Sequence, residues 1–377
     1  MRSDQPIVVG LARHDGRARS TRSALLRLVP AVLLLYLAVL SGPRAGAQEG
    51  DAATPAPLAV AGDVLTTLVA APPDAPAIYA VGSAGLYRSD DGGLAWHRAG
   101  PLPPPGRVVA ALDDPVLLLA GSYPPCARTG GNERPLYRSD DGGATWQEVE
   151  GATGIAPLAA WNGSDLAVGA SCAGLLISTD GGRQWQRSSL VPADYLVSVF
   201  APLAGGDPSK PLGLVIGTSE GGTSRVWRLD LSDPAHPTAS DPLLRFWGGG
   251  AAAGDGDRYL VGTATGVFVS DDAGVTWRQS RTGLEDVTVS VDPFGTPVPD
   301  AERRRGFGIS AVALDPVDAG HLWAGTVGGL YDSSDGGGTW HRVGDVTTPV
   351  NGLVVAPKGG LLLVQTPHTV VTVPLAA

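Results

Sequence analysis

The chain has 377 residues, with 53 Gly, 32 Pro, 17% charged residues and a formal net charge of −10. So much Gly and Pro disfavours long helices, and the low charge density disfavours a disordered, self-repelling chain. Because 43% of the residues are hydrophobic, a large all-β or mixed domain with a sizeable core is expected. Two cysteines exclude a disulfide-rich scaffold and a four-thiolate zinc site.

The charge is divided unevenly along the chain. Residues 1–47 hold seven arginines and two aspartates, a balance of +5, so the remaining 330 residues carry 20 − 35 = −15. An acidic body argues against nucleic acid and against an anionic membrane surface as partners.

The N-terminus, residues 1–47, reads as an export signal. A stretch rich in arginine ends at Arg27, the apolar run Leu28–Leu40 follows, and Ala45-Gly46-Ala47 forms a cleavage site. We expect cleavage near Ala47, a linker over residues 48–56, one folded domain over residues 57–377, and a secreted or cell-envelope location. An uncleaved signal anchor is the alternative and would be the chain's membrane contact, but the run is shorter than the ~20 residues that span a bilayer.

An octapeptide recurs five times along the rest of the chain. It reads SDDGGLAW at Ser89–Trp96, SDDGGATW at Ser139–Trp146, STDGGRQW at Ser178–Trp185, SDDAGVTW at Ser270–Trp277 and SSDGGGTW at Ser333–Trp340. The pattern resembles the Asp-box, or BNR, repeat of β-propeller proteins, in which each box is a hairpin turn.

The residue types in the box each have a physical role. The second glycine supplies a positive φ, the aspartate accepts hydrogen bonds from the turn, and the tryptophan packs into the sheet. The residues with this structural role are Asp91, Trp96, Asp141, Trp146, Asp180, Trp185, Asp272, Trp277, Asp335 and Trp340. The calcium-ligand spacing D-x-D-x-D-G is missing, so no metal is expected at the boxes.

A second repeat is an apolar strand that ends in Gly and a small residue. It also occurs in the two parts of the chain that have no octapeptide, and it marks a blade there. Third-strand centres then fall at Tyr87, Tyr137, Leu176, Trp227, Phe268, Tyr331 and Val371. Their separations of 39 to 63 residues predict an all-β, seven-bladed propeller of four-stranded antiparallel blades. The N-terminal segment Leu58–Ala61 is predicted to be the outer strand of the last blade, which closes the ring and removes an exposed edge.

A candidate binding face follows from the propeller prediction. The loops between strands two and three share a face with the connections from strand four to the next strand one, and two long segments there are Ser122–Pro135 and Gln279–Gly308. They concentrate cations on an acidic body, and guanidinium groups suit planar carboxylates. The candidate residues are Arg128, Arg134, Arg281, Arg303, Arg304, Arg305 and Phe307. A solvated charge run is the alternative, because Asp300 and Glu302 flank the arginine triplet.

The two cysteines fall in neighbouring loops of the same predicted face. Cys126 lies in the loop between strands two and three of blade two, and Cys172 in the equivalent loop of blade three. An exported protein keeps disulfides, so a Cys126–Cys172 bridge is predicted. Two free thiols are the alternative.

No catalytic constellation stands out, and no cofactor is expected. The resemblance to sialidases would imply an arginine cluster for a sialate carboxylate, but no arginine lies between Gln48 and Tyr87, where that family has its Arg-Ile-Pro motif. Tandem-propeller xyloglucanases are similar blade by blade, but that resemblance implies two rings with a cleft between them. Sortilin-type receptors imply Cys-rich modules that this sequence does not contain.

The segment Gly85–Trp96 is most similar to exported propellers of the photosystem II stability and assembly-factor type, except that Ala95 replaces a threonine. That resemblance implies a monomeric, non-enzymatic protein that binds a protein or glycan partner on its loop-rich face. A sialidase-type glycoside hydrolase is the alternative.

Overall fold

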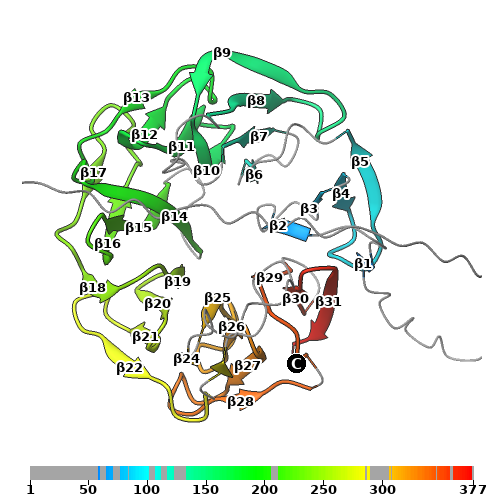
Figure 1. Ribbon diagram of the computed structural model, residues 1–377, viewed down its shortest axis with the longest axis vertical. Helices are drawn as coiled ribbons and strands as arrows, with labels where there is room; N and C mark the ends of the chain where they lie inside the picture. Colours follow the sequence, from blue (N-terminus) through cyan, green and yellow to red (C-terminus); the bar gives the residue numbers. More distant parts are fainter. Residues whose placement is uncertain are drawn as a thin grey trace, which may run out of the picture. The chain divides into compact units, whose positions relative to one another are not determined.

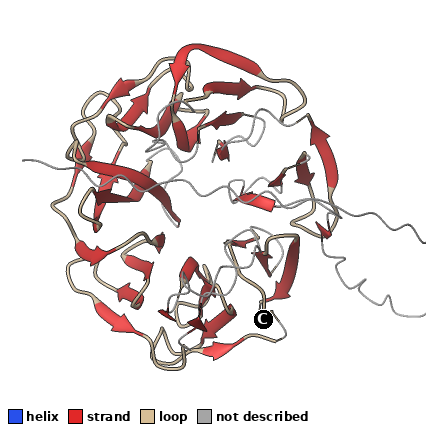
Figure 2. Ribbon diagram, in the orientation of Figure 1, coloured by secondary structure: helices blue, strands red, loops and turns tan. Residues whose placement is uncertain are grey.

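The computed structural model describes residues 58–59, 65–70, 77–83, 85–101, 107–111, 117–122, 133–204, 211–284, 287–288, 305–306, 308–344, 346–356 and 360–375. All of them belong to one compact unit, Ala53–Ala377, and the other unit, Met1–Ala52, lies outside them, as does the expected export signal. Figure 2 shows strands, turns and loops but no helix in this described part. A helix capable of crossing a membrane is accordingly not found among these residues.

Antiparallel four-stranded sheets follow one another along the chain (Figure 1). The first is β2 (Leu65–Ala70), β3 (Ile78–Gly82), β4 (Leu86–Ser89) and β5 (His97–Gly100). The second is β6 (Arg107–Ala110), β7 (Leu118–Gly121), β8 (Pro135–Ser139) and β9 (Gln147–Thr153). The third is β10 (Ala156–Trp161), β11 (Leu166–Ser171), β12 (Gly174–Ser178) and β13 (Gln186–Arg187).

The middle of the chain forms a nine-stranded sheet. Its first part is β14 (Tyr195–Ala204), β15 (Leu212–Ser219), β16 (Thr223–Asp230), β17 (Thr238–Ala239) and β18 (Leu244–Trp247). Its second part is β19 (Ala251–Asp255), β20 (Arg258–Thr263), β21 (Gly266–Ser270) and β22 (Arg278–Ser280). Each part is antiparallel, and parallel pairing of β14 with β19 joins them. Both β17 and β18 pair with β16, so the outer strand of the first part is broken in two.

The C-terminal third contains two more four-stranded antiparallel sheets and one small sheet. The strands are β25 (Ile309–Leu314), β26 (Leu322–Thr326), β27 (Gly329–Ser333) and β28 (His341–Arg342), then β29 (Gly352–Val355), β30 (Leu361–Gln365), β31 (Thr369–Pro374) and β1 (Leu58–Ala59). The small sheet, β23 (Val287–Thr288) with β24 (Arg305–Gly306), lies within the segment expected to be an irregular loop, and corrects that expectation.

The second strand of each sheet is mostly buried on both faces. β3, β7 and β30 are buried along their whole length, whereas the outer strands β5, β13 and β28 are largely exposed. The apolar clusters lie between consecutive sheets, as where Tyr79 and Leu86 pack with Val108 and Leu118. This placement explains why the inner strands read as continuous apolar runs rather than alternating ones.

The Asp-box turns have a repeated hydrogen-bond pattern. In the first box the Ser89 hydroxyl donates to Asp91 and accepts from the Gly93 amide, both at 2.8 Å, and Asp91 Oδ1 accepts from the Ala95 amide at 2.9 Å. The serine-to-aspartate and glycine-to-serine bonds recur in the other four boxes. The boxes therefore stabilise their own hairpins.

The second glycine of each box lies against the preceding sheet. A Cβ built on it would come within 2.3 to 3.3 Å of a side chain there. The pairs are Gly143 with Leu86, Gly182 with Leu119, Gly274 with Leu243 and Gly337 with Val269. In the first box the neighbour of Gly93 is Leu363 of β30, and Leu65 and Ile78 share a cluster with Leu363 and Val370. The first sheet thus packs on the last one as each other sheet packs on its predecessor.

The expectation of an all-β chain with four-stranded antiparallel sheets is confirmed. β1 pairs with β31 through Leu58↔Val370 and Ala59↔Thr369. The first strands of successive sheets also contact one another in the order β2, β6, β10, β14, β19, β25, β29, and β29 contacts β2.

Candidate functional site

The predicted arginine face is only partly within the described residues. Arg134, half-buried at the start of β8, and Arg281, exposed after β22, are both described, and no contact between them is found there. Arg305 begins β24, but its side chain is not described. Arg128, Arg303, Arg304 and Phe307 lie outside the described residues. The predicted arginine face therefore stays a prediction.

Cys172 lies in the β11–β12 turn and is disulfide-bonded. The only other cysteine of the chain, Cys126, lies outside the described residues, so the Cys126–Cys172 pairing stays a prediction. Titration of the denatured, unreduced protein is expected to find no free thiol. Two free thiols per chain would contradict the bridge.

The box carboxylates accept hydrogen bonds from residues of their own turns. Hydrogen bonds from the Thr339 amide, the Ser333 hydroxyl and the Thr339 hydroxyl hold the pKa of Asp335 well below its usual range. Bonds from the Thr276 hydroxyl and amide lower the pKa of Asp272 in the same way. A carboxylate held ionised by its turn is a poor general acid at neutral pH, so the boxes are not candidates for catalysis.

These depressed pKa values make stability depend on pH. A carboxylate whose folded pKa lies below the ordinary value of about 3.9 stabilises the fold above that value and loses this contribution as pH falls toward its folded pKa. We expect the free energy of unfolding to decrease steadily from pH 5 to pH 2 in urea titrations. Replacing Asp335 by Asn should make this decrease shallower, and an identical pH slope would contradict the role of the box.

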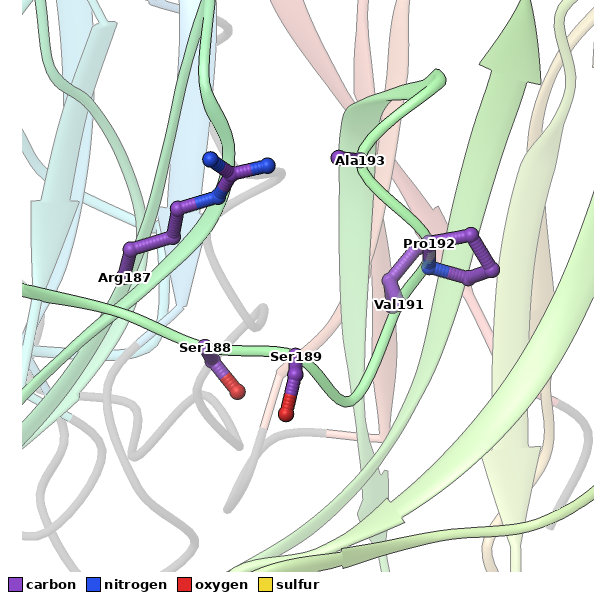
Figure 3. Close-up of a pocket in the computed structure, with 6 residues that line it drawn as sticks. All are labelled: Arg187, Ser188, Ser189, Val191, Pro192 and Ala193. Atoms are coloured by element: carbon purple, nitrogen blue, oxygen red, sulfur yellow. The ribbon is translucent and has the colours of Figure 1, made fainter.

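A cavity of about 290 Å³ opens beside the connection between β13 and β14 (Figure 3). Its lining residues are Arg187, Ser188, Ser189, Val191, Pro192 and Ala193. Arg187 faces Pro192 and Ala193 across the opening, with the two serines between them. Backbone bonds from Ser188 to Leu175 and from Tyr195 to Pro192 fix this connection.

Two acidic residues lie directly after the cavity, at the end of the β14–β15 ladder. The last pair of that ladder is Tyr195↔Ser219, so the next position outward in the same register places Asp194 opposite Glu220. Both side chains are exposed, and neither makes an ion pair or hydrogen bond within the described part of the chain. Both residues lie in turns just beyond the last paired residues, so two exposed carboxylates flank the same end of this ladder.

Aromatic and cationic side chains brace the same end of this sheet. The rings of Tyr195 and Trp227 meet edge to face at 5.1 Å, and the Arg225 guanidinium lies 5.4 Å from the centre of the Tyr195 ring. These contacts hold the first residue of β14 in place. The position of Asp194, one residue earlier, is therefore set by a packed element.

Several other carboxylates of the described chain have partners. The best-ordered group joins Asp315 and Asp332 through His321, whose two ring nitrogens are each 3.6 Å from one carboxylate. Asp315 also accepts hydrogen bonds from the amides of Val317 and Asp318, so it caps the β25–β26 turn. No cluster of three metal-binding side chains is found among the described residues.

Comparisons with known proteins bear on the repeat and on the function. The BNR/Asp-box repeat model matches residues 137–148. A xyloglucanase from a Paenibacillus species is 26% identical over 277 residues, which cover 67% of this chain and 25% of that protein. The chain thus spans about a quarter of the length of this curated relative.

Three solved structures match parts of this chain. The GH74 enzyme of Niastella koreensis has 15% identity and a TM-score of 0.43 over 80% of this chain and 62% of that chain. The GH74 xyloglucanase of Xanthomonas campestris has 18% identity and a TM-score of 0.37 over 80% and 43%. A chain of the mitotic checkpoint complex has 12% identity and a TM-score of 0.56 over 93% and 100%, a likeness of fold alone.

These findings correct the expected function. The Asp-box repeat is present, but the prediction of a non-enzymatic binding protein is wrong, because the curated relative is a xyloglucanase and favours a glycoside hydrolase. The alternative weighed from the sequence was a sialidase-type glycoside hydrolase, and its general class, glycoside hydrolase, is supported better than the leading interpretation.

Proposed function

We propose that this chain is a glycoside hydrolase that acts on a β-linked polysaccharide of the xyloglucan type. The observation that carries the proposal is the 26% identity to a xyloglucanase over 277 residues. The relative is about four times as long as the matched region. Its activity and its substrate are therefore proposed for this chain.

The chemistry needs two carboxylates on either side of the bond that is cleaved. One protonates the leaving oxygen, and the other attacks the sugar or activates a water. Asp194 and Glu220 flank one end of the β14–β15 ladder, are exposed, and have no partner within the described residues. We assign the two roles to this pair without deciding which residue is the acid.

The fold supports a position of Asp194 and Glu220 on the same face of the molecule. We infer that the four-stranded sheets are the blades of a seven-bladed propeller closed by β1, supported by the β1–β31 pairing and the packing of Gly93 on Leu363. Asp194 then lies in a connection from strand four to strand one, and Glu220 in a turn between strands two and three, so both belong to one face. The cavity lined by Arg187 and Pro192 opens at the same connection.

An exported, monomeric enzyme would meet its polysaccharide outside the cytoplasm. The sequence of residues 1–47, with its arginines, apolar run and Ala45-Gly46-Ala47, supports this location. The partner under this proposal is a glycan chain, with no nucleic acid involved.

A substrate panel separates this proposal from the sialidase type. The purified chain is incubated in parallel with soluble xyloglucan and with a fluorogenic sialoside, and released sugar is measured. We expect turnover of xyloglucan alone. Turnover of the sialoside alone would replace the proposed substrate class by that of sialidases.

A further inference from the structure

One tryptophan of the chain differs from all the others in its exposure. Trp247, the last residue of β18, is 70% exposed. The other tryptophans are buried or half-buried, and they are Trp96, Trp146, Trp161, Trp185, Trp227, Trp277, Trp323 and Trp340. An exposed Trp forgoes the stabilisation that burial of its large surface gives in the other eight places.

The backbone holds Trp247 in a fixed position. Trp247 is opposite Thr223 in the β16–β18 ladder, the Gly248 amide donates to the Gly222 carbonyl at 2.8 Å, and the Ser224 hydroxyl donates to the Gly248 carbonyl. Bonds to the end of the β15–β16 turn and to the start of β16 therefore fix the residue that follows Trp247. The indole is attached to a paired strand rather than to a loose loop.

The indole rests on a glycine. Gly222 has φ +81°, and a Cβ built there would lie 3.1 Å from Trp247 Cζ2 and 3.3 Å from Cε2. The benzene part of the ring thus lies against bare backbone. Cβ atoms built on Gly248 and Gly249 would meet nothing within 4 Å, so the two residues that follow Trp247 border open space.

Trp247 shares the end of its sheet with the proposed catalytic pair. Glu220 and Gly222 belong to the same β15–β16 turn, and Trp247 flanks that turn from β18. Neighbouring strands are about 4.8 Å apart, so β18 lies roughly 10 Å from β15, which Glu220 follows, and roughly 14 Å from β14, which Asp194 precedes. Those separations correspond to sugar units that are not adjacent in one bound chain.

We propose that Trp247 is a stacking platform for a pyranose ring of the glucan backbone. The C–H face of a sugar ring is apolar, and the electron-rich face of an indole attracts it while leaving the hydroxyls in water. A flat, rigid and uncovered ring suits an uncharged polymer better than it suits a charged or a deeply buried ligand. This inference rests on the proposed function and adds a binding position for its substrate.

Affinity electrophoresis of the full chain in gels that contain soluble xyloglucan tests this inference. Trp247→Ala should weaken binding by about tenfold, equivalent to about 1.4 kcal/mol, whereas Trp247→Phe should remain within about threefold of the wild type. The matched control is Val275→Ala, which removes an apolar side chain that is 80% exposed in a box turn, and it should bind like the wild type. Binding should also change the tryptophan fluorescence of the wild type more than that of Trp247→Ala.

The outcomes distinguish this inference from the proposed function. If Trp247→Ala binds and cleaves xyloglucan like the wild type, the platform is wrong while the hydrolase proposal stands. If the wild type neither binds nor cleaves xyloglucan, both are wrong. If Trp247→Ala and Val275→Ala lose affinity equally, the effect is general and the platform is refuted.

Discussion

Replacing either Asp194 by Asn or Glu220 by Gln is expected to lower kcat/KM for xyloglucan by about 10²–10⁴-fold, the usual effect of losing a group that transfers a proton. The substitutions keep size and polarity, and both residues are exposed at the end of the β14–β15 ladder, so folding should be preserved. Initial rates of reducing-end release, measured with matched circular dichroism spectra, give the result.

Glu133→Gln is the matched control for these variants. Glu133 is also exposed and also precedes a third strand, β8, but it lies in another sheet and has no acidic residue across a ladder. Its variant should keep activity within about twofold of the wild type, as for a surface charge outside the site. Equal losses in all three variants, or full activity in Asp194→Asn, would contradict the assigned pair.

Replacing Gly93 by Ala is expected to destabilise the protein strongly, because it tests how the first sheet packs on the last. Gly93 has φ +97°, and an added Cβ would lie 2.5 Å from Leu363 Cδ2, in a side chain that is fully buried. The positive φ costs about 1–2 kcal/mol for an L-residue, and overpacking adds about 1–3 kcal/mol. Gly92 also has a positive φ, +79°, but a Cβ built on it would meet nothing within 4 Å. Gly92→Ala should therefore cost only the about 1–2 kcal/mol that comes from the positive φ.

Urea denaturation of both variants measures the difference, and a double variant sharpens it. Leu363→Ala alone should cost about 2–5 kcal/mol because it leaves a cavity, but it opens space for the new methyl group. The cost of Gly93→Ala plus Leu363→Ala should therefore be clearly less than the sum of the single variants. Additive costs, or a Gly93→Ala variant no less stable than Gly92→Ala, would contradict packing of the first sheet on the last.

The repeated sheets could be predicted from the sequence because their signals are local. Each box carries its own turn, since Ser89, Asp91 and Gly93 bond to one another within five residues. The inner strands are apolar along their length because neighbouring sheets cover both faces. The predicted third-strand centre Val371 accordingly lies within β31, Thr369–Pro374.

Features that depend on distant contacts could not be predicted in this way. The parallel pairing of Leu203 with Gly254 joins strands about fifty residues apart, and the break between β17 and β18 follows from a turn that is not a box. The β23–β24 pair likewise brings Val287 to Gly306 across a segment that has no periodic pattern.

The candidate site was missed for a similar reason. Asp194 and Glu220 are ordinary acidic residues in an acidic chain, and only the register of β14 with β15 brings them together. The concentration of positive charge favoured six arginines, and the side chains of four of them lie outside the described residues. One signal was available, because Trp247 belongs to no box and follows no apolar strand pattern, yet precedes three glycines.

The most direct test of the hydrolase proposal is a time course of reducing ends released from soluble xyloglucan by the purified wild-type chain, with the Asp194→Asn, Glu220→Gln double variant beside it. We expect steady release by the wild type and release by the double variant lower by at least about a hundredfold. No release by a folded wild-type chain, or equal release by the double variant, would contradict it.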